Sequence, residues 1–173
     1  CGAGPVFRAK VNMHAIPACA GRYYIILFSQ MSSLPVRRII MSNASFACAV
    51  NCMDGRTQEP VIQYLKENLH VDYVDAVTEP GPIKFLAERN MAWVDNIRAC
   101  CDVSVQKHGS SAIALIAHYD CAGNPQPKEV QLEQLRESAR VVRGWYSDVA
   151  IYGLWVNENW TVEEVFISVP ETK

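Results

Sequence analysis

The chain has 173 residues, of which half are hydrophobic and a fifth are charged, and its formal net charge is -2. This length suits one domain with a substantial core and is short for two. A net charge so close to zero gives no basis for a nucleic-acid partner. The best early apolar run, residues 23–28, is far shorter than the ~20 residues of a membrane-spanning helix. We therefore expect a globular protein with neither a nucleic-acid nor a membrane partner.

The N-terminal part of the chain differs in charge from the remainder. Residues 1–53 contain five basic residues and no acidic one, whereas the rest of the chain has 11 basic and 18 acidic residues. The shift predicts a basic N-terminal extension over residues 1–40 and a domain over residues 41–173. The extension begins with Cys1 and is interpreted as an arm that docks on a partner subunit, as a targeting segment, or as sequence upstream of a start at Met41.

From Ser45 onward, short apolar runs alternate with longer amphipathic ones. The apolar runs predict strands and the amphipathic runs predict helices. The expected strands cover residues 45–51, 73–78, 111–118 and 149–156, with 161–169 as an extension at the sheet edge. The expected helices cover residues 60–69, 83–107 and 128–146. This alternation predicts an α/β fold, a three-layer α-β-α arrangement around a mainly parallel central sheet.

Two short cysteine motifs follow two of the expected strands. They are Cys52-Met53-Asp54-Gly55-Arg56 and His118-Tyr119-Asp120-Cys121. Because ligands of parallel sheets bind outside the carboxyl ends of the strands, we expect both motifs at one edge of the sheet. Two thiols and one imidazole are a set of zinc ligands that leaves the fourth position for water or substrate. The sequence therefore predicts a catalytic Zn2+ site made by Cys52, His118 and Cys121.

Charged side chains accompany these cysteines. The spacing of Cys52, Asp54 and Arg56 would place all three on one side of an extended chain. Zinc lowers the pKa of a bound water from about 15.7 toward ~7, which supplies hydroxide for attack on an electrophilic carbon. Asp54 either accepts a hydrogen bond from that water or ligates the metal and closes the site, and Arg56 decides between the two by pairing with the carboxylate. Asp120 is expected to orient His118 or to bind backbone amides in its own turn.

Taken singly, the same residues have simpler interpretations. Asp54 and Arg56 could form an ordinary surface ion pair, Cys52 and Cys121 could be core thiols, and His118 could be a hydrogen-bonded histidine at a strand end. Their joint occurrence at the ends of two apolar strands favours the metal site.

The remaining cysteines and aromatic residues are interpreted as packing residues. Cys48 and one of the adjacent pair Cys100 and Cys101 are expected in the core, and thiols in such apolar surroundings indicate a reducing, cytoplasmic location. The C-terminal third holds three tryptophans: Trp145, Trp155 and Trp160. We expect them in the core or in a subunit interface rather than in a substrate platform.

As a pair, the two motifs resemble those of the β-class carbonic anhydrases, which carry C-x-D-[S/A]-R after the first core strand and H-x-x-C after a later one. The resemblance covers residues 45–157. It implies Zn2+ on Cys52, His118 and Cys121, a gating dyad of Asp54 and Arg56, and a homodimer or higher homo-oligomer, often with an N-terminal arm laid over the partner. The implied activity is that of a carbonic anhydrase (carbonate dehydratase), the reversible hydration of CO2 to bicarbonate by zinc-bound hydroxide.

The chain departs from this family pattern in three places. After the second cysteine the chain has Ala122-Gly123, whereas the family has Gly as the next residue. Gly55 stands at the position where the family has Ser or Ala. Residues 78–82, Thr-Glu-Pro-Gly-Pro, stand where the family has Arg-Asn-Ala-Gly. These departures indicate a divergent, carbonic-anhydrase-like branch. Two other functions therefore stay open, a COS/CS2 hydrolase with the same fold and metal, and a non-catalytic zinc-binding protein in which Asp54 fills the fourth position.

Overall fold

The computed structural model describes residues 44–170, so the extension predicted over residues 1–40 lies outside the described part and stays a prediction. The elements are β1 (Phe46–Cys52), α1 (Gly55–Leu69), β2 (Tyr73–Glu79), α2 (Pro82–Ala87), α3 (Met91–Lys107), β3 (Ala112–His118), α4 (Lys128–Arg143), β4 (Ala150–Val156) and β5 (Val162–Ser168). Within residues 44–170, none of the helices has the length and hydrophobicity needed to cross a membrane.

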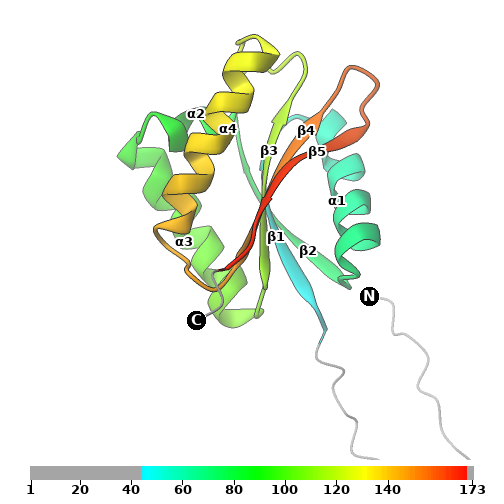
Figure 1. Ribbon diagram of the computed structural model, residues 1–173, viewed down its shortest axis with the longest axis vertical. Helices are drawn as coiled ribbons and strands as arrows, with labels where there is room; N and C mark the ends of the chain where they lie inside the picture. Colours follow the sequence, from blue (N-terminus) through cyan, green and yellow to red (C-terminus); the bar gives the residue numbers. More distant parts are fainter. Residues whose placement is uncertain (1–43, 171–173) are drawn as a thin grey trace, which may run out of the picture. The chain divides into compact units, whose positions relative to one another are not determined.

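The strands form one five-stranded sheet in the order β2-β1-β3-β4-β5 (Figure 1). The first four are parallel to their neighbours, and only β5, at the edge, is antiparallel. β1 therefore lies between β2 and β3, and its Ala49 pairs with Ala114 of β3. Because β1 and β3 are adjacent and parallel, their carboxyl ends lie side by side. The predicted α/β fold with a mainly parallel sheet is confirmed.

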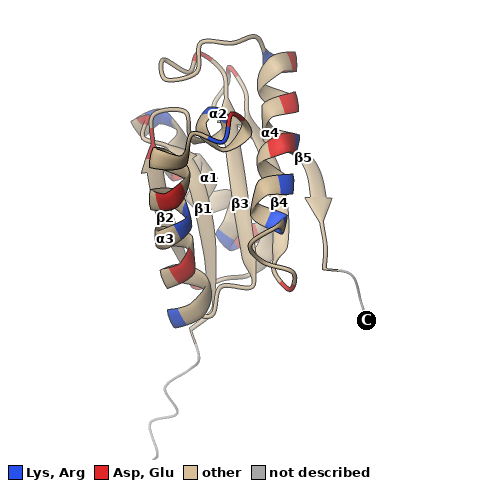
Figure 2. Cartoon of the chain, turned by 90° about the vertical axis from the view of Figure 1, so that its left-hand side faces the viewer, with Lys and Arg blue, Asp and Glu red and all other residues tan. Residues whose placement is uncertain are grey.

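Helices cover both faces of the sheet, with α1 on one face and α2, α3 and α4 on the other (Figure 1). All seven residues of β3 are buried, as expected for a central strand covered on both sides. Figure 2 shows acidic and basic residues along α4. Of the packing thiols, Cys48 and Cys101 are fully buried with their Sγ atoms 3.8 Å apart, whereas Cys100 is exposed, in agreement with the prediction.

The single helix predicted over residues 83–107 is wrong, because the chain forms two helices there. The break lies at Arg89, which has a left-handed φ of 53°. The Glu88 N–H still bonds back to the Lys84 carbonyl at 2.9 Å, and Asn90 begins the next helix as its N-cap. Two shorter helices let α2 pack against α4 separately from α3, and Ser138 Oγ of α4 donates to the Ile83 carbonyl at 2.8 Å.

Candidate metal centre

The first cysteine motif spans the turn from β1 into α1. Cys52 is the last residue of β1, and Asp54 is the N-cap of α1, where its side chain accepts a hydrogen bond from the Arg56 backbone N–H at 3.0 Å. A buried polar pair holds this turn, because Thr57 Oγ1 donates to Asn51 Oδ1 at 3.0 Å. The extended arrangement predicted for Cys52, Asp54 and Arg56 is therefore wrong. The helix also begins five residues before the predicted start at residue 60.

The second motif follows β3. His118 ends that strand and Cys121 lies in the loop beyond it, and both side chains are buried. Between them, the Tyr119 N–H donates to the Val156 carbonyl at 2.9 Å, and Asp120 has a left-handed φ of 53°. This turn brings Cys121 back to the side of His118, as the spacing predicts.

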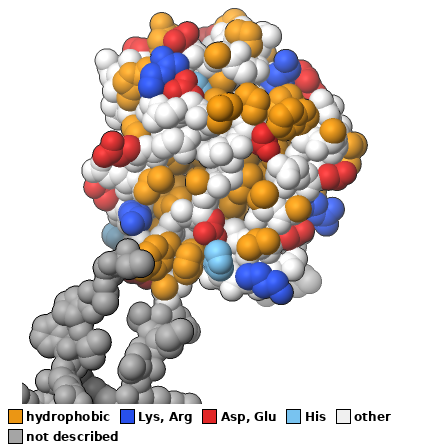
Figure 3. All heavy atoms as spheres, turned by 180° about the vertical axis from the view of Figure 1, so that it is seen from behind, with side chains coloured by type: hydrophobic (Ala, Val, Ile, Leu, Met, Phe, Trp, Pro, Cys, Tyr) orange, Lys and Arg blue, Asp and Glu red, His pale blue; other side chains and the backbone are white. Residues whose placement is uncertain are grey.

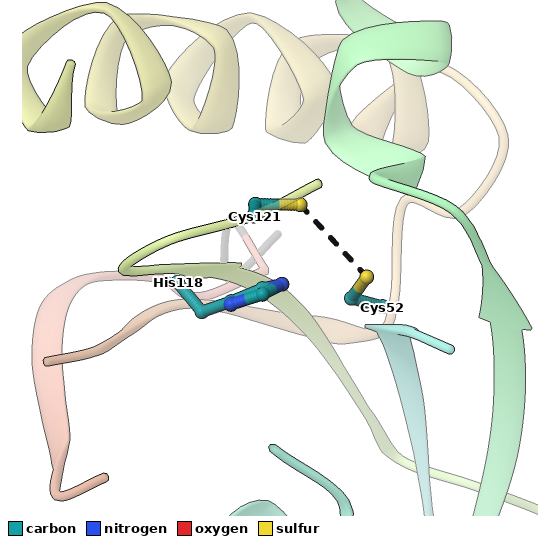
Figure 4. A group of neighbouring side chains, drawn as sticks. All are labelled: Cys52, His118 and Cys121. Atoms are coloured by element: carbon teal, nitrogen blue, oxygen red, sulfur yellow. Dashed lines mark hydrogen bonds between the residues drawn. The ribbon is translucent and has the colours of Figure 1, made fainter. Parts of the chain in front are cut away.

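The structure brings the three predicted ligands together. The ligand atoms of Cys52, His118 and Cys121 all lie within 4.8 Å of one another, and the two Sγ atoms are 3.9 Å apart. Figure 4 shows the His118 imidazole directed toward the two thiols. His118 Nδ1 lies 2.8 Å from the Tyr119 carbonyl oxygen, whereas its buried Nε2 has no hydrogen-bond partner among the described residues. A ring that donates through Nδ1 has a free lone pair on Nε2, which is the arrangement of a metal-binding histidine.

The contact between the two thiols shifts their pKa values in opposite directions. The hydrogen bond with Cys121 lowers the pKa of Cys52 to about 4, although burial opposes the shift. The same hydrogen bond, together with burial, raises the pKa of Cys121. For His118, burial disfavours the charged ring, yet the Cys52 thiolate and the Tyr119 carbonyl raise its pKa overall. A thiolate is therefore present at neutral pH, in the form that ligates metals.

Asp54 and Arg56 form an ion pair beside this cluster. Arg56 Nε lies 3.0 Å from Asp54 Oδ1, and Arg56 Nη2 lies 2.6 Å from Asp54 Oδ2. Arg56 also donates to the Asp120 carboxylate and to the Asp120 carbonyl, each at 3.2 Å. The sequence predicts that Asp120 orients His118 or binds its own turn, but its observed partner is Arg56. The guanidinium thus joins the two motifs.

The Asp54–Arg56 pair leads to a prediction about acid stability. The Arg56 side chain lowers the pKa of Asp54 from 3.8 to about 2, with burial opposing. Because the folded pKa lies below the unfolded one, the stability from this pair is fully present above pH 3.8 and is lost as the pH falls toward about 2. We expect the urea midpoint of metal-free wild-type protein to fall more steeply over this interval than that of Asp54→Asn. Parallel curves for the two proteins would contradict this role of the pair.

The loop after β2 supports the cluster. A Cβ on Gly123 would lie 2.5 Å from the Pro80 carbonyl carbon and 2.9 Å from the Gly81 nitrogen, so the two backbones touch. The backbone N–H of Gly81 helps to lower the pKa of Cys52, and the backbone N–H groups of Asn124 and Gly123 oppose the rise in the pKa of Cys121. Backbone N–H groups directed at sulfur favour the thiolate. Residues 78–82, where the chain departs from the family pattern, therefore pack directly against the candidate site.

Comparison with known proteins decides the family. A family model described as "Putative carbonic anhydrase" matches residues 42–166, most of the chain. The chain belongs to this family. The match confirms the resemblance to the β-class carbonic anhydrases that the two motifs indicate. No curated protein matches the chain.

Solved structures of two fungal β-carbonic anhydrases are similar to this chain. One, from a study of two tetrameric enzymes of the filamentous ascomycete Sordaria macrospora, is 12% identical, covers 73% of this chain and 83% of its own, and has a TM-score of 0.42. The other, CafA of the fungal pathogen Aspergillus fumigatus, is 10% identical, covers 71% and 76%, and has a TM-score of 0.40. Membership of the carbonic anhydrase family rests on the family model alone.

Several neighbours of the site are missing from the sequence-based prediction. Asn51 and Thr57 fix the turn before α1, and Gln58 Nε2 donates to the Asp54 carbonyl at 3.2 Å. Trp160 lies against Arg56, whose Cζ is 4.4 Å from the centre of the indole ring. A polar Asn51 at the end of an apolar strand is a signal that could have been used. No spacing in the sequence connects Trp160 with Arg56.

Proposed function

We propose that this protein binds one Zn2+ through Cys52, His118 and Cys121 and catalyses the reversible hydration of CO2 to bicarbonate. The observation that carries the proposal is the buried Nε2 of His118, which has no hydrogen-bond partner within residues 44–170. Its ring stands beside two thiols, and the ligand atoms of the three residues lie within 4.8 Å of one another. Two thiols and an imidazole are a donor set that zinc accepts, with one position left for a reactant. Bound there, zinc would acidify a water so that hydroxide is available near neutral pH.

Three residues around the proposed zinc site have defined roles in this reaction. His118 keeps its ring orientation through the 2.8 Å contact with the Tyr119 carbonyl, which leaves Nε2 for the metal. Arg56 binds both carboxylate oxygens of Asp54 and so holds that side chain away from the metal's fourth position. Asp54 remains ionised and keeps acceptor capacity for a hydrogen bond from the attacking water. Its role is to orient that water, and the role of Arg56 is to keep Asp54 available for it.

The direct test is stopped-flow CO2 hydration by zinc-quantified protein, with Cys52→Ser as the metal-site control. We expect hydration that scales with zinc content and is lost in the variant. COS hydrolysis is measured on the same samples. Zinc-loaded protein that hydrolyses COS but does not hydrate CO2 would move the function to the COS-type hydrolase. Zinc-loaded protein with neither activity would identify a non-catalytic zinc protein.

Arg56→Ala tests the gating dyad. Without the guanidinium, Asp54 is free to ligate the metal, so we expect the hydration rate to fall by about 10- to 100-fold, the usual effect of losing a partner in the outer shell of a metal site. Zinc content should stay at the wild-type level, measured by atomic absorption. Arg98→Ala is the matched control, because Arg98 stacks on Trp145 and has no place in the site. An unchanged rate in Arg56→Ala would remove the dyad from the mechanism.

We further propose a homodimer or larger homo-oligomer and a cytoplasmic location. Figure 3 shows hydrophobic side chains gathered on the face that contains the β2 edge of the sheet, where Tyr73 and Val103 are about half exposed. Such a surface supports burial against a second copy of the chain. Light scattering at several protein concentrations tests the oligomer.

The cysteines support the cytoplasmic location. The five cysteines of residues 44–170 are all free thiols, as a reducing compartment would keep them.

A further inference from the structure

The turn between β4 and β5 holds Trp160 in one position. Asn157 Oδ1 accepts hydrogen bonds from the backbone N–H groups of Asn159 at 2.9 Å and Thr161 at 3.0 Å, and the Trp160 N–H donates to the Asn157 carbonyl at 3.0 Å. Trp160 itself has a left-handed φ of 58°. Such a conformation is uncommon for a bulky side chain and persists only where the surrounding contacts impose it. The turn therefore fixes the backbone from which the indole projects.

The indole lies against the guanidinium of the gating dyad. Arg56 Cζ is 4.4 Å from the ring centre, within the range of a cation–π interaction. On the core side, Trp160 packs on the hydrophobic cluster beneath α1, which includes Val61 and Leu65. The Arg56 side chain is 44% exposed and has many rotamers available to it. Its orientation toward Asp54 therefore depends on what the guanidinium touches.

Arg56 has tethers on three sides. Asp54 and Asp120 each accept hydrogen bonds from the guanidinium, and the guanidinium carbon lies over the Trp160 ring. The Asp120 side chain is 67% exposed, so water competes for its hydrogen bond. Trp160 is partly buried, and contact with its ring disfavours the rotamers in which Arg56 would leave Asp54. Solvent therefore weakens the contact with the indole less than it weakens the contact with Asp120.

We propose that Trp160 is a positioning residue for Arg56: it holds the guanidinium in the orientation that keeps Asp54 away from the metal. The proposal rests on the zinc site proposed above and adds Trp160 to the gating dyad of Asp54 and Arg56. In this role Trp160 is not a ligand of the metal and acts only through Arg56.

The experiment uses the full chain loaded with cobalt(II) and titrated with thiocyanate. Thiocyanate changes the visible d–d absorption only when the fourth metal position can exchange. We expect saturable binding in the wild type and an affinity lower by about two- to fivefold in Trp160→Leu, as expected for loss of an exposed cation–π contact. Trp160→Phe keeps an aromatic face and should lie between the two. Trp145→Leu removes a second tryptophan that faces an arginine in the described part of the chain, and this variant should bind thiocyanate as the wild type does.

A double-variant cycle separates positioning from a general structural effect. In an Arg56→Ala background, Trp160→Leu should change the thiocyanate affinity no further, because its only route to the metal has been removed. An equal loss in both backgrounds would overturn the proposal, as would wild-type affinity in both Trp160→Leu and Trp160→Phe. If Trp160→Leu does not fold, Trp160→Phe with and without Arg56 decides the question.

The readouts distinguish this proposal from the proposed activity. Trp160-dependent thiocyanate binding by a protein that does not hydrate CO2 would support the positioning role and refute the hydratase. Normal hydration with no dependence of anion binding on Trp160 would refute the positioning role alone. A wild-type protein that binds no cobalt, or a cobalt protein that binds no thiocyanate in any variant, would overturn the positioning role.

Discussion

Cys52→Ser should leave the protein without zinc and considerably less stable. The change removes one of three ligands while leaving a near-isosteric side chain at the end of β1, so loss of metal rather than loss of packing dominates. A ligand present at 1,000 times its dissociation constant stabilises the folded state by about 4 kcal/mol. For a chain of this size, losing that contribution lowers the melting temperature by about 10 °C. Zinc content after dialysis and the thermal midpoint, measured with and without added zinc, check both expectations.

The matched control for this prediction is Cys48→Ala on the same strand. Cys48 is fully buried and faces Cys101 at 3.8 Å, away from the ligand cluster. Its replacement should cost some packing energy and leave the zinc content unchanged. A Cys52→Ser protein that retains one zinc per chain would refute the ligand assignment.

Gly123→Ala should have the second largest effect. The new methyl group would lie 2.5 Å from the Pro80 carbonyl carbon and 2.6 Å from its oxygen, and these are backbone atoms that cannot rotate away. Overpacking of this kind typically costs about 1–3 kcal/mol, occasionally more. The two loops would have to separate, which moves the backbone of Gly81 and Gly123, whose N–H groups favour the low pKa of the thiolate forms, away from the two thiols. We expect a lower urea midpoint and weaker zinc binding in competition with a chelator.

Gly55→Ala is the control for the glycine prediction. A Cβ at Gly55 meets no atom within 4 Å, and the residue opens α1, where alanine is preferred over glycine. The variant should therefore be as stable as the wild type or slightly more so, with unchanged zinc affinity. If Gly123→Ala behaved as Gly55→Ala does, the close contact between the loops would have no part in the site.

The strands and the ligand cluster could be predicted because their signals are local. Apolar runs marked β1 and β3, and each run ends directly at a ligand, Cys52 in one case and His118 in the other. Once a parallel sheet is inferred, adjacency of the two strand ends follows from topology. The family match over residues 42–166 agrees with that inference.

The details that were missed depend on contacts between distant segments. No glycine or proline marks the break at Arg89, and the two helices separate because α2 packs on α4 through contacts such as that of Ser138 with Ile83. The helix start at Gly55 depends on Asp54, which caps α1. The sequence-based prediction instead placed Asp54 in an extended chain. The partners of Arg56, Asp120 and Trp160, come from two other loops, and local periodicity carries no information about such pairs.

The order of strands explains why a site arises at this edge of the sheet. From the end of β1 the chain turns to α1 on one face, and from the end of β3 it turns through the 119–127 loop to α4 on the opposite face. Two neighbouring strands whose connections leave in opposite directions form a topological switch point. Here that divergence leaves Cys52 and His118 between two departing segments, with Arg56 reaching from one to the other. The location of the centre is thus a property of chain routing, and substitutions elsewhere in the sheet can accumulate without displacing it.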